Sequence, residues 1–141
     1  MTLQEAVKKL EKEIKEAEPE SRVTVEDALF ETLSAWAELV RAISRKDKEA
    51  VKDEVGYVYM TLVTGRYLSR RAGHAALYKA PDKVMKAAGE KHLIKRLFKP
   101  MQDLFTSQYE AQELRLFVKC LHMVAYEYGT TLEDCLNRVM E

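Results

Sequence analysis

Apolar residues recur at intervals of three and four along most of this chain, which is the spacing of one face of an α-helix. The first such stripe runs from Leu3 to Ala17 and ends before Pro19. Only three prolines and five glycines interrupt 141 residues, and no segment alternates like a half-buried strand. The sequence therefore predicts an all-α helical bundle of about five to seven helices, and its length predicts a single domain over residues 1–141.

Capping signals place several of the predicted helices. A capping box at Thr24–Asp27 predicts a long helix over residues 25–44, and a second box at Thr131–Asp134 opens a final short helix. β-branched residues are dense between residues 48 and 69, but a stretch of this length without a turn signal favours a helix over a strand. The predicted core stripe of the first long helix consists of Val25, Leu29, Leu33, Val40 and Ile43, with Trp36 beside it.

The middle of the chain is expected to be more broken. Gly65 and Gly73 are read as the first helix breakers, and residues 81–89 as a short helix. Pro100 is expected to interrupt the basic amphipathic segment that precedes it. A further long helix is expected to start at residue 106 or 107 and to end at Gly129.

Charge is balanced overall but unevenly distributed. The chain has 23 basic and 23 acidic residues, which removes any global argument for nucleic acid or an anionic membrane. Between Arg66 and Lys99, ten basic residues stand against two acids, a net charge of +8, so each flank carries −4. This segment is either a docking surface for an acidic or phosphate-rich partner or a solvated face that balances the acidic helices. Nucleic acid is the less favoured partner, because no aromatic stacking array accompanies the charge. The candidate contact residues are Arg70, Arg71, Lys91, Lys95 and Lys99.

The remaining composition predicts a soluble, cytoplasmic protein. Cys120 and Cys135 lie in apolar helical surroundings without metal-ligand spacing, and they are expected to be buried, reduced thiols. No charged-then-apolar leader opens the chain, and no apolar run approaches the roughly 20 residues that a membrane span needs.

Acidic residues on two predicted helices approach the arrangement of a metal site. The first helix offers Glu31 and Glu38 on one face, and the second offers Asp53 and Glu54. Carboxylates and water are the ligands that Mg²⁺ prefers. A second ligand on the face of Glu54 would stand three residues later, where Tyr57 lies instead. A phenol with a pKa of about 10 does not bind magnesium near neutral pH, so Tyr57 is expected to fill the core.

Two separated pieces, Glu38–Val63 and Tyr128–Leu136, together resemble the MazG-like, all-α nucleoside triphosphate pyrophosphohydrolases, particularly the small bacteriophage versions. The resemblance covers residues 24–69 and 127–141 and leaves residues 70–126 as a basic insertion. It implies that an EExxE element on one helix faces an ExxD element on the next. It also implies that their four carboxylates hold Mg²⁺, which neutralises the triphosphate while nucleoside monophosphate and pyrophosphate form.

The chain departs from that pattern at three of its five acidic positions. With Glu38 as the last acid of EExxE, Ser34 and Ala35 occupy the positions of two glutamates. With Glu54 as the first acid of ExxD, Tyr57 occupies the position of the aspartate. The resemblance therefore implies a degenerate magnesium site built on Glu38 and Glu54.

Three functions are expected from these features. The favoured one is a divergent MazG-like protein with weak or absent pyrophosphohydrolase activity, which acts by binding a nucleotide or a protein. The second is an active Mg²⁺-dependent enzyme whose ligands are Glu31, Glu38, Asp53 and Glu54. The third is an interaction protein whose basic segment binds a host protein or nucleic acid. A homodimer or higher oligomer is expected, because family bundles are completed between chains, and the host cytoplasm is the expected location if a phage encodes the chain.

Overall fold

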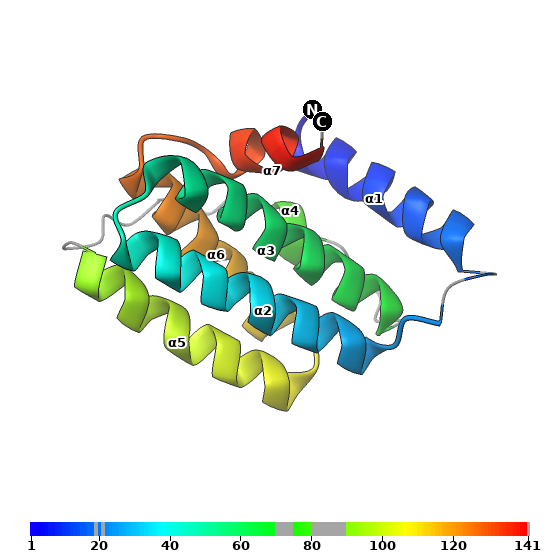
Figure 1. Cartoon of the computed structure of the whole chain (residues 1–141). Coiled ribbons are helices and arrows are strands. Elements are labelled where there is room, and N and C mark those ends of the chain that lie inside the picture. The colour runs from blue at the N-terminus through cyan, green and yellow to red at the C-terminus, as the bar shows by residue number, and fades with distance from the viewer. Residues whose placement is uncertain (19, 21, 70–74, 80–89, 141) are drawn as a thin grey trace.

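The predicted all-α fold is confirmed by a computed structural model, which describes residues 1–18, 20, 22–69, 75–79 and 90–140. These residues form helices and no strand (Figure 1). The helices are α1 (Leu3–Ala17), α2 (Val25–Ser44), α3 (Lys48–Leu68), α4 (Ala75–Tyr78), α5 (Glu90–Ser107), α6 (Ala111–Glu127) and α7 (Leu132–Met140).

The helices form two layers with a cover. In Figure 1, α3, α2 and α5 lie side by side in front, α6 and α4 lie behind them, and α1 and α7 cross the top. Helix α3 is central, because it packs against α1, α2, α6 and α7. Neighbouring helices α2 and α5 run in opposite directions.

Local signals set the helix ends as predicted. Thr24 and Asp27 form a complete capping box, and Thr131 Oγ1 accepts a hydrogen bond from the Asp134 backbone N–H. Gly129 has a φ of +70°, which is the left-handed conformation that glycine adopts readily after a helix.

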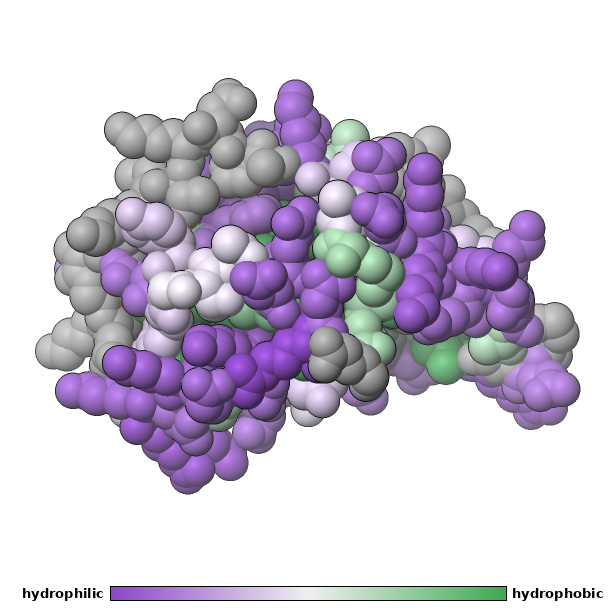
Figure 2. All heavy atoms as spheres, turned by 90° about the horizontal axis from the view of Figure 1, so that it is seen from above, coloured by the Kyte–Doolittle hydropathy of each residue, from purple (hydrophilic) through white to green (hydrophobic). Residues whose placement is uncertain are grey.

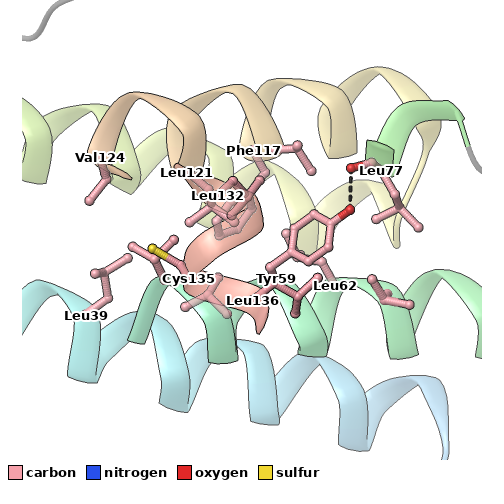
Figure 3. Close-up of a cluster of buried hydrophobic side chains, with 14 of the residues drawn as sticks. Leu39, Tyr59, Leu62, Leu77, Phe117, Leu121, Val124, Leu132, Cys135 and Leu136 are labelled. Carbon is pink, nitrogen blue, oxygen red and sulfur yellow. Dashed lines mark hydrogen bonds between the residues drawn. The ribbon is translucent and has the colours of Figure 1, made fainter. Parts of the chain in front are cut away.

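The core draws side chains from the whole length of the chain (Figure 3). Leu39 of α2 and Leu62 of α3 lie with Phe117 and Leu121 of α6, and all four are fully buried. Each such side chain contributes roughly 1.5–3 kcal/mol through burial. Residues 70–126, which the resemblance sets apart as an insertion, therefore supply part of the same core as α2 and α3.

A buried polar contact ties α4 to this core. The Tyr59 hydroxyl donates a hydrogen bond to the Leu77 carbonyl at 2.5 Å, which Figure 3 shows as a dashed line. Burial raises the pKa of Tyr59 above its usual value, so the phenol stays neutral and keeps its proton for this bond.

The predicted core stripe of α2 is wrong at one position. The buried face consists of Ala28, Leu29, Thr32, Leu39, Ala42 and Ile43, whereas Leu33 is 37% exposed. Trp36 is half-buried and donates from Nε1 to the Leu97 carbonyl at 2.9 Å, which joins α2 to α5.

Pro100 does not interrupt the helix, contrary to the prediction. Helix α5 continues through it from Glu90 to Ser107. Since proline has no N–H, the Arg96 carbonyl one turn earlier has no intrahelical donor. The Cys120 thiol of α6 donates to that carbonyl at 3.5 Å. A neighbouring helix therefore supplies the bond that Pro100 cannot make.

The next helix begins later than predicted. Residues Gln108 and Tyr109 have φ values of +52° and +69°, and they form a turn between α5 and α6. Tyr109 is fully buried, and its hydroxyl lies 3.4 Å from Thr32 Oγ1. The Arg66 guanidinium donates to the Tyr109 carbonyl. These contacts stabilise a backbone conformation that is uncommon for residues other than glycine.

Gly65 is not a helix breaker, because α3 continues to Leu68. A Cβ atom at Gly65 would overlap the ring of Tyr109. Similarly, a Cβ atom at Gly56 would overlap the carbonyl of Cys135 in α7. Both glycines allow a close approach to α3. Gly73 and the predicted helix over residues 81–89 lie outside the described residues.

Candidate functional site

A groove between α2 and α3 brings together most of the predicted site. It has a volume of about 390 Å³. Glu31 and Glu38 line it from α2, and Glu54 lines it from α3. The residues that line this acidic groove are Val23, Ala28, Glu31, Ser34, Ala35, Glu38, Glu54, Tyr57, Met60, Thr61 and Thr64.

The short connection between α2 and α3 explains this arrangement. Only Arg45, Lys46 and Asp47 separate the two helices, which therefore return antiparallel and side by side. Asp47 caps α3 by accepting from the Ala50 N–H at 3.1 Å. Acidic residues on the facing sides of such a helix pair converge in one groove.

The electrostatics of the groove centre on Glu54. Its side chain is half-buried, whereas Glu31 and Glu38 are exposed. Desolvation raises the pKa of Glu54 above its ordinary value, and repulsion from Glu38 and Asp53 raises it further. None of the described residues that line the groove is basic. No cation within the lining offsets the negative charge, although Arg41, three residues beyond Glu38 on α2, pairs with the Glu38 carboxylate at 3.8 Å.

We expect Glu54→Gln to stabilise the fold at pH 7 by up to about 1 kcal/mol, a modest effect because the side chain is partly solvated. A raised folded-state pKa means that ionised Glu54 is unfavourable above that pKa. The penalty fades as the pH falls toward the ordinary glutamate value of about 4.5, where the unfolded chain also binds the proton. Urea unfolding of both proteins at pH 7 and pH 4 measures the difference. Glu13→Gln, at an exposed position of α1, is the matched control and should change little. An equal effect of both substitutions at pH 7 would contradict the origin assigned to the shift.

Asp53, the other predicted ligand of α3, does not line the groove. Its Oδ1 accepts from Arg138 Nε of α7 at 2.5 Å. The same guanidinium binds Glu49 at 2.5 Å, and this contact holds the pKa of Glu49 below its usual value. The structure therefore places Asp53 outside the groove, in an ion pair with Arg138. Sequence reasoning missed Arg138, because only the packing of α7 on α3 brings it to these acids.

Tyr57 was expected in the core and is instead 46% exposed. It lines the acidic groove with Ser34 and Ala35. All three positions at which the chain departs from the MazG-like ligand pattern therefore border the same groove as Glu38 and Glu54.

The described part of the predicted basic surface lies elsewhere. Lys95 and Lys99 line a second groove, of about 330 Å³, between α5 and α6. Lys99 pairs with Asp103 at 3.7 Å. Arg70 and Arg71 lie outside the described residues, as does the side chain of Lys91.

The acidic groove offers oxygen donors suited to a hard cation, namely three carboxylates and the hydroxyls of Ser34, Thr61 and Thr64. Its carboxylates are spread out. Across the part of the chain that the structure describes, no group of three or more His, Cys, Asp or Glu side chains is close enough to hold a metal ion. Such a groove fits a weakly held cation that draws some of its ligands from a substrate.

None of the helices in the described ranges is long and apolar enough to cross a membrane. The chain matches no known protein family, no curated protein and no solved structure.

Proposed function

We propose that the protein is a divergent MazG-like member that binds a nucleoside triphosphate as its magnesium complex in the acidic groove, with weak or absent hydrolysis. The observation that carries this proposal is the gathering of Glu31, Glu38 and Glu54 around one groove whose described lining has no base. A divalent cation relieves their mutual repulsion. Phosphate oxygens can then complete the coordination of the cation, which is the usual manner of magnesium binding.

The missing ligands account for the weak activity. Ser34, Ala35 and Tyr57 supply no carboxylate where the resemblance implies one, and Asp53 is engaged by Arg138. A metal held by fewer carboxylates is positioned less firmly against the reacting phosphate, so the developing charge is stabilised less. Binding is expected to survive this loss better than catalysis.

The walls of the groove also fit a nucleotide. Ala28 and Met60 provide apolar surface. Thr61 and Thr64 provide hydroxyl oxygens that can accept hydrogen bonds, since both hydroxyls donate to carbonyls of α3. A base with a flat apolar face and polar edges suits such mixed surroundings, which are typical of small-molecule sites.

Calorimetric titration with Mg²⁺, in the presence of a non-hydrolysable nucleoside triphosphate, tests the proposal. Glu38→Ala and Glu54→Ala should each weaken nucleotide binding by at least about tenfold, the loss of one charge-assisted contact. Glu26→Ala, on the same helix but outside the groove, should leave binding unchanged. The proposal fails if the wild-type protein shows no binding, or if both groove variants bind like the control.

Pyrophosphate release across the common NTPs and dNTPs, with Mg²⁺ or Mn²⁺, distinguishes binding from catalysis. Slow or undetectable release supports the divergent binding protein. Turnover near the 1–10³ s⁻¹ that is typical of enzymes would favour the active alternative, with Glu31, Glu38 and Glu54 as the remaining ligands.

A further inference from the structure

Helices α2 and α5 share an outer face that exposes large apolar side chains. Phe30 and Phe98 are 63% and 61% exposed, and Leu33 and Phe105 are 37% and 38% exposed. The aromatic rings lie against one another across the two helices. Phe30 meets Phe105 edge-on at 6.4 Å, and Trp36 meets Phe98 edge-on at 5.3 Å. We call these five residues the aromatic face.

The aromatic face differs from the face that carries α1 and α7. Figure 2 shows that face from above, and hydrophilic side chains cover most of it. Scattered exposed apolar residues are ordinary on a protein surface, but a contiguous cluster rich in aromatic residues marks an interaction site. Phenylalanine and tryptophan are also enriched in the buried centre of protein interfaces.

Opposite charges border the aromatic face on its two sides. Glu31 and Glu38 lie on the side of α2 that faces α3, and Lys95 and Lys99 lie on the side of α5 that faces α6. Glu38 and Lys99 also have partners within the chain, Arg41 and Asp103, so Glu31 and Lys95 carry most of the contrast. The helices as a whole show the same contrast. Helix α2 has four acidic residues and one basic residue, a net charge of −3, whereas α5 has four basic and two acidic residues, a net charge of +2. Across the surface, the acidic edge of α2 is therefore followed by the apolar side chains of α2 and α5, and then by the basic edge of α5.

We propose that the aromatic face binds a second copy of this chain, related to the first by a two-fold axis that runs parallel to α2 and α5. This axis places α2 of each copy over α5 of the other. The acidic edge of one copy then meets the basic edge of its partner on both sides of a shared apolar centre. A two-fold interface is self-complementary in this way.

The alternative two-fold axis, perpendicular to the helices, is disfavoured. It would place α2 over α2 and bring Glu31 and Glu38 against their own copies. Like charges across an interface cost several kcal/mol. The order of the charges therefore favours the two-fold axis parallel to the helices over the perpendicular one.

The dimensions of the face suit a dimer. Helix α2 has 20 residues and α5 has 18, so each is about 30 Å long and about 10 Å wide. Side by side, the two helices present a projected area of about 600 Å², without the additional surface of protruding side chains. Each partner contributes roughly 800 Å² to a standard interface.

Mass measurement by light scattering on the full chain, at tens of micromolar, provides the first test. The wild-type protein should show 32.6 kDa, twice the mass of one 16.3 kDa chain. Phe30→Glu combined with Phe98→Glu should raise the dimer dissociation constant by at least about 100-fold, because central aromatic residues dominate interface energy. Both side chains are largely exposed in the single chain, so circular dichroism should show an unchanged helix content. Leu116→Glu, at a 47%-exposed position of α6, is the matched control and should leave the dimer intact.

A charge exchange tests the orientation of the axis. Glu31→Lys/Glu38→Lys and Lys95→Glu/Lys99→Glu should each be monomeric alone, because both edges of each variant then carry one sign. Mixed together, the two variants should form a heterodimer whose stability falls as salt is added. The readout is mass, so it is independent of nucleotide binding.

Each negative outcome counts against the proposal. A monomeric wild-type chain would overturn the interface altogether. A dimer that is insensitive to the Phe30 and Phe98 changes but is broken by Leu116→Glu would place the contact on α6. If either charge variant alone forms a homodimer as readily as the wild type does, the parallel axis is overturned, because the perpendicular axis opposes like charges in the wild type and in both variants.

Discussion

Replacing Ser34 and Ala35 by Glu and Tyr57 by Asp in one chain is expected to raise the affinity for Mg²⁺ by at least about tenfold. All three side chains line the groove that holds Glu38 and Glu54. The new carboxylates would restore all the acidic positions of the EExxE and ExxD elements that the resemblance implies. They would also crowd negative charge around the desolvated Glu54, whose pKa is already raised. The triple variant should therefore unfold more readily without metal and regain stability when Mg²⁺ is added.

Calorimetry and thermal unfolding with and without Mg²⁺ measure both effects. A second triple variant, Gln4→Glu/Gln102→Glu/Gln112→Glu, adds three negative charges at exposed positions outside the groove. It should bind Mg²⁺ as the wild type does. If the two triple variants bind Mg²⁺ equally, the groove is not a metal site that has lost its ligands, and the argument from ancestry fails.

Gly65→Ala is expected to cost about 3 kcal/mol of stability. The added methyl group would overlap the ring of Tyr109, which is fully buried and has Thr32 beside its hydroxyl. Burial raises the pKa of Tyr109 to about 12. The phenol therefore stays neutral, and ionisation does not favour moving the ring out of the core into solvent. Overpacking of a tight core costs about 1–3 kcal/mol and occasionally more. Urea unfolding of both proteins provides the measurement.

A double-mutant cycle isolates the cause of that loss. Tyr109→Ala alone should cost about 3–5 kcal/mol, as for other buried aromatic residues. In that background, Gly65→Ala should cost nothing or even stabilise α3 by up to about 1 kcal/mol, because alanine favours helix more than glycine does. Equal costs of Gly65→Ala in both backgrounds would show that contact with Tyr109 is not the reason for the glycine.

Local signals explain which parts of the fold were predictable. The Thr24 and Thr131 caps, the turn at Gly129 and the existence of most helices follow from residues close in sequence. The roles of Pro100 and Gly65 do not, because each depends on a partner from another helix: Cys120 in the first case and Tyr109 in the second. Tyr109 itself follows a polar stretch and gives no periodic signal of its burial.

The candidate site also has some features that the sequence predicts and others that it does not. Glu31, Glu38 and Glu54 converge because a three-residue connection forces α2 and α3 to pair, and the sequence shows that connection directly. The pairing of Asp53 with Arg138 was not predicted, because nothing near Asp53 in sequence indicates that Arg138 will reach it. Tyr57 was placed in the core because a phenol does not bind magnesium near neutral pH, yet the side of α3 that it occupies faces the groove. The Mg²⁺ ion and the nucleotide remain predictions.

The bond between Cys120 and the Arg96 carbonyl makes two distant positions interdependent. With an ordinary residue at position 100, α5 would donate to that carbonyl itself, and the thiol would supply only a second bond to an oxygen that has two lone pairs. With Pro100 in place, loss of the thiol would leave the carbonyl unpaired. In homologous chains, a residue that cannot donate at position 120 is therefore expected only where position 100 is not proline. This pairing of Pro100 with Cys120 could help to identify distant homologues.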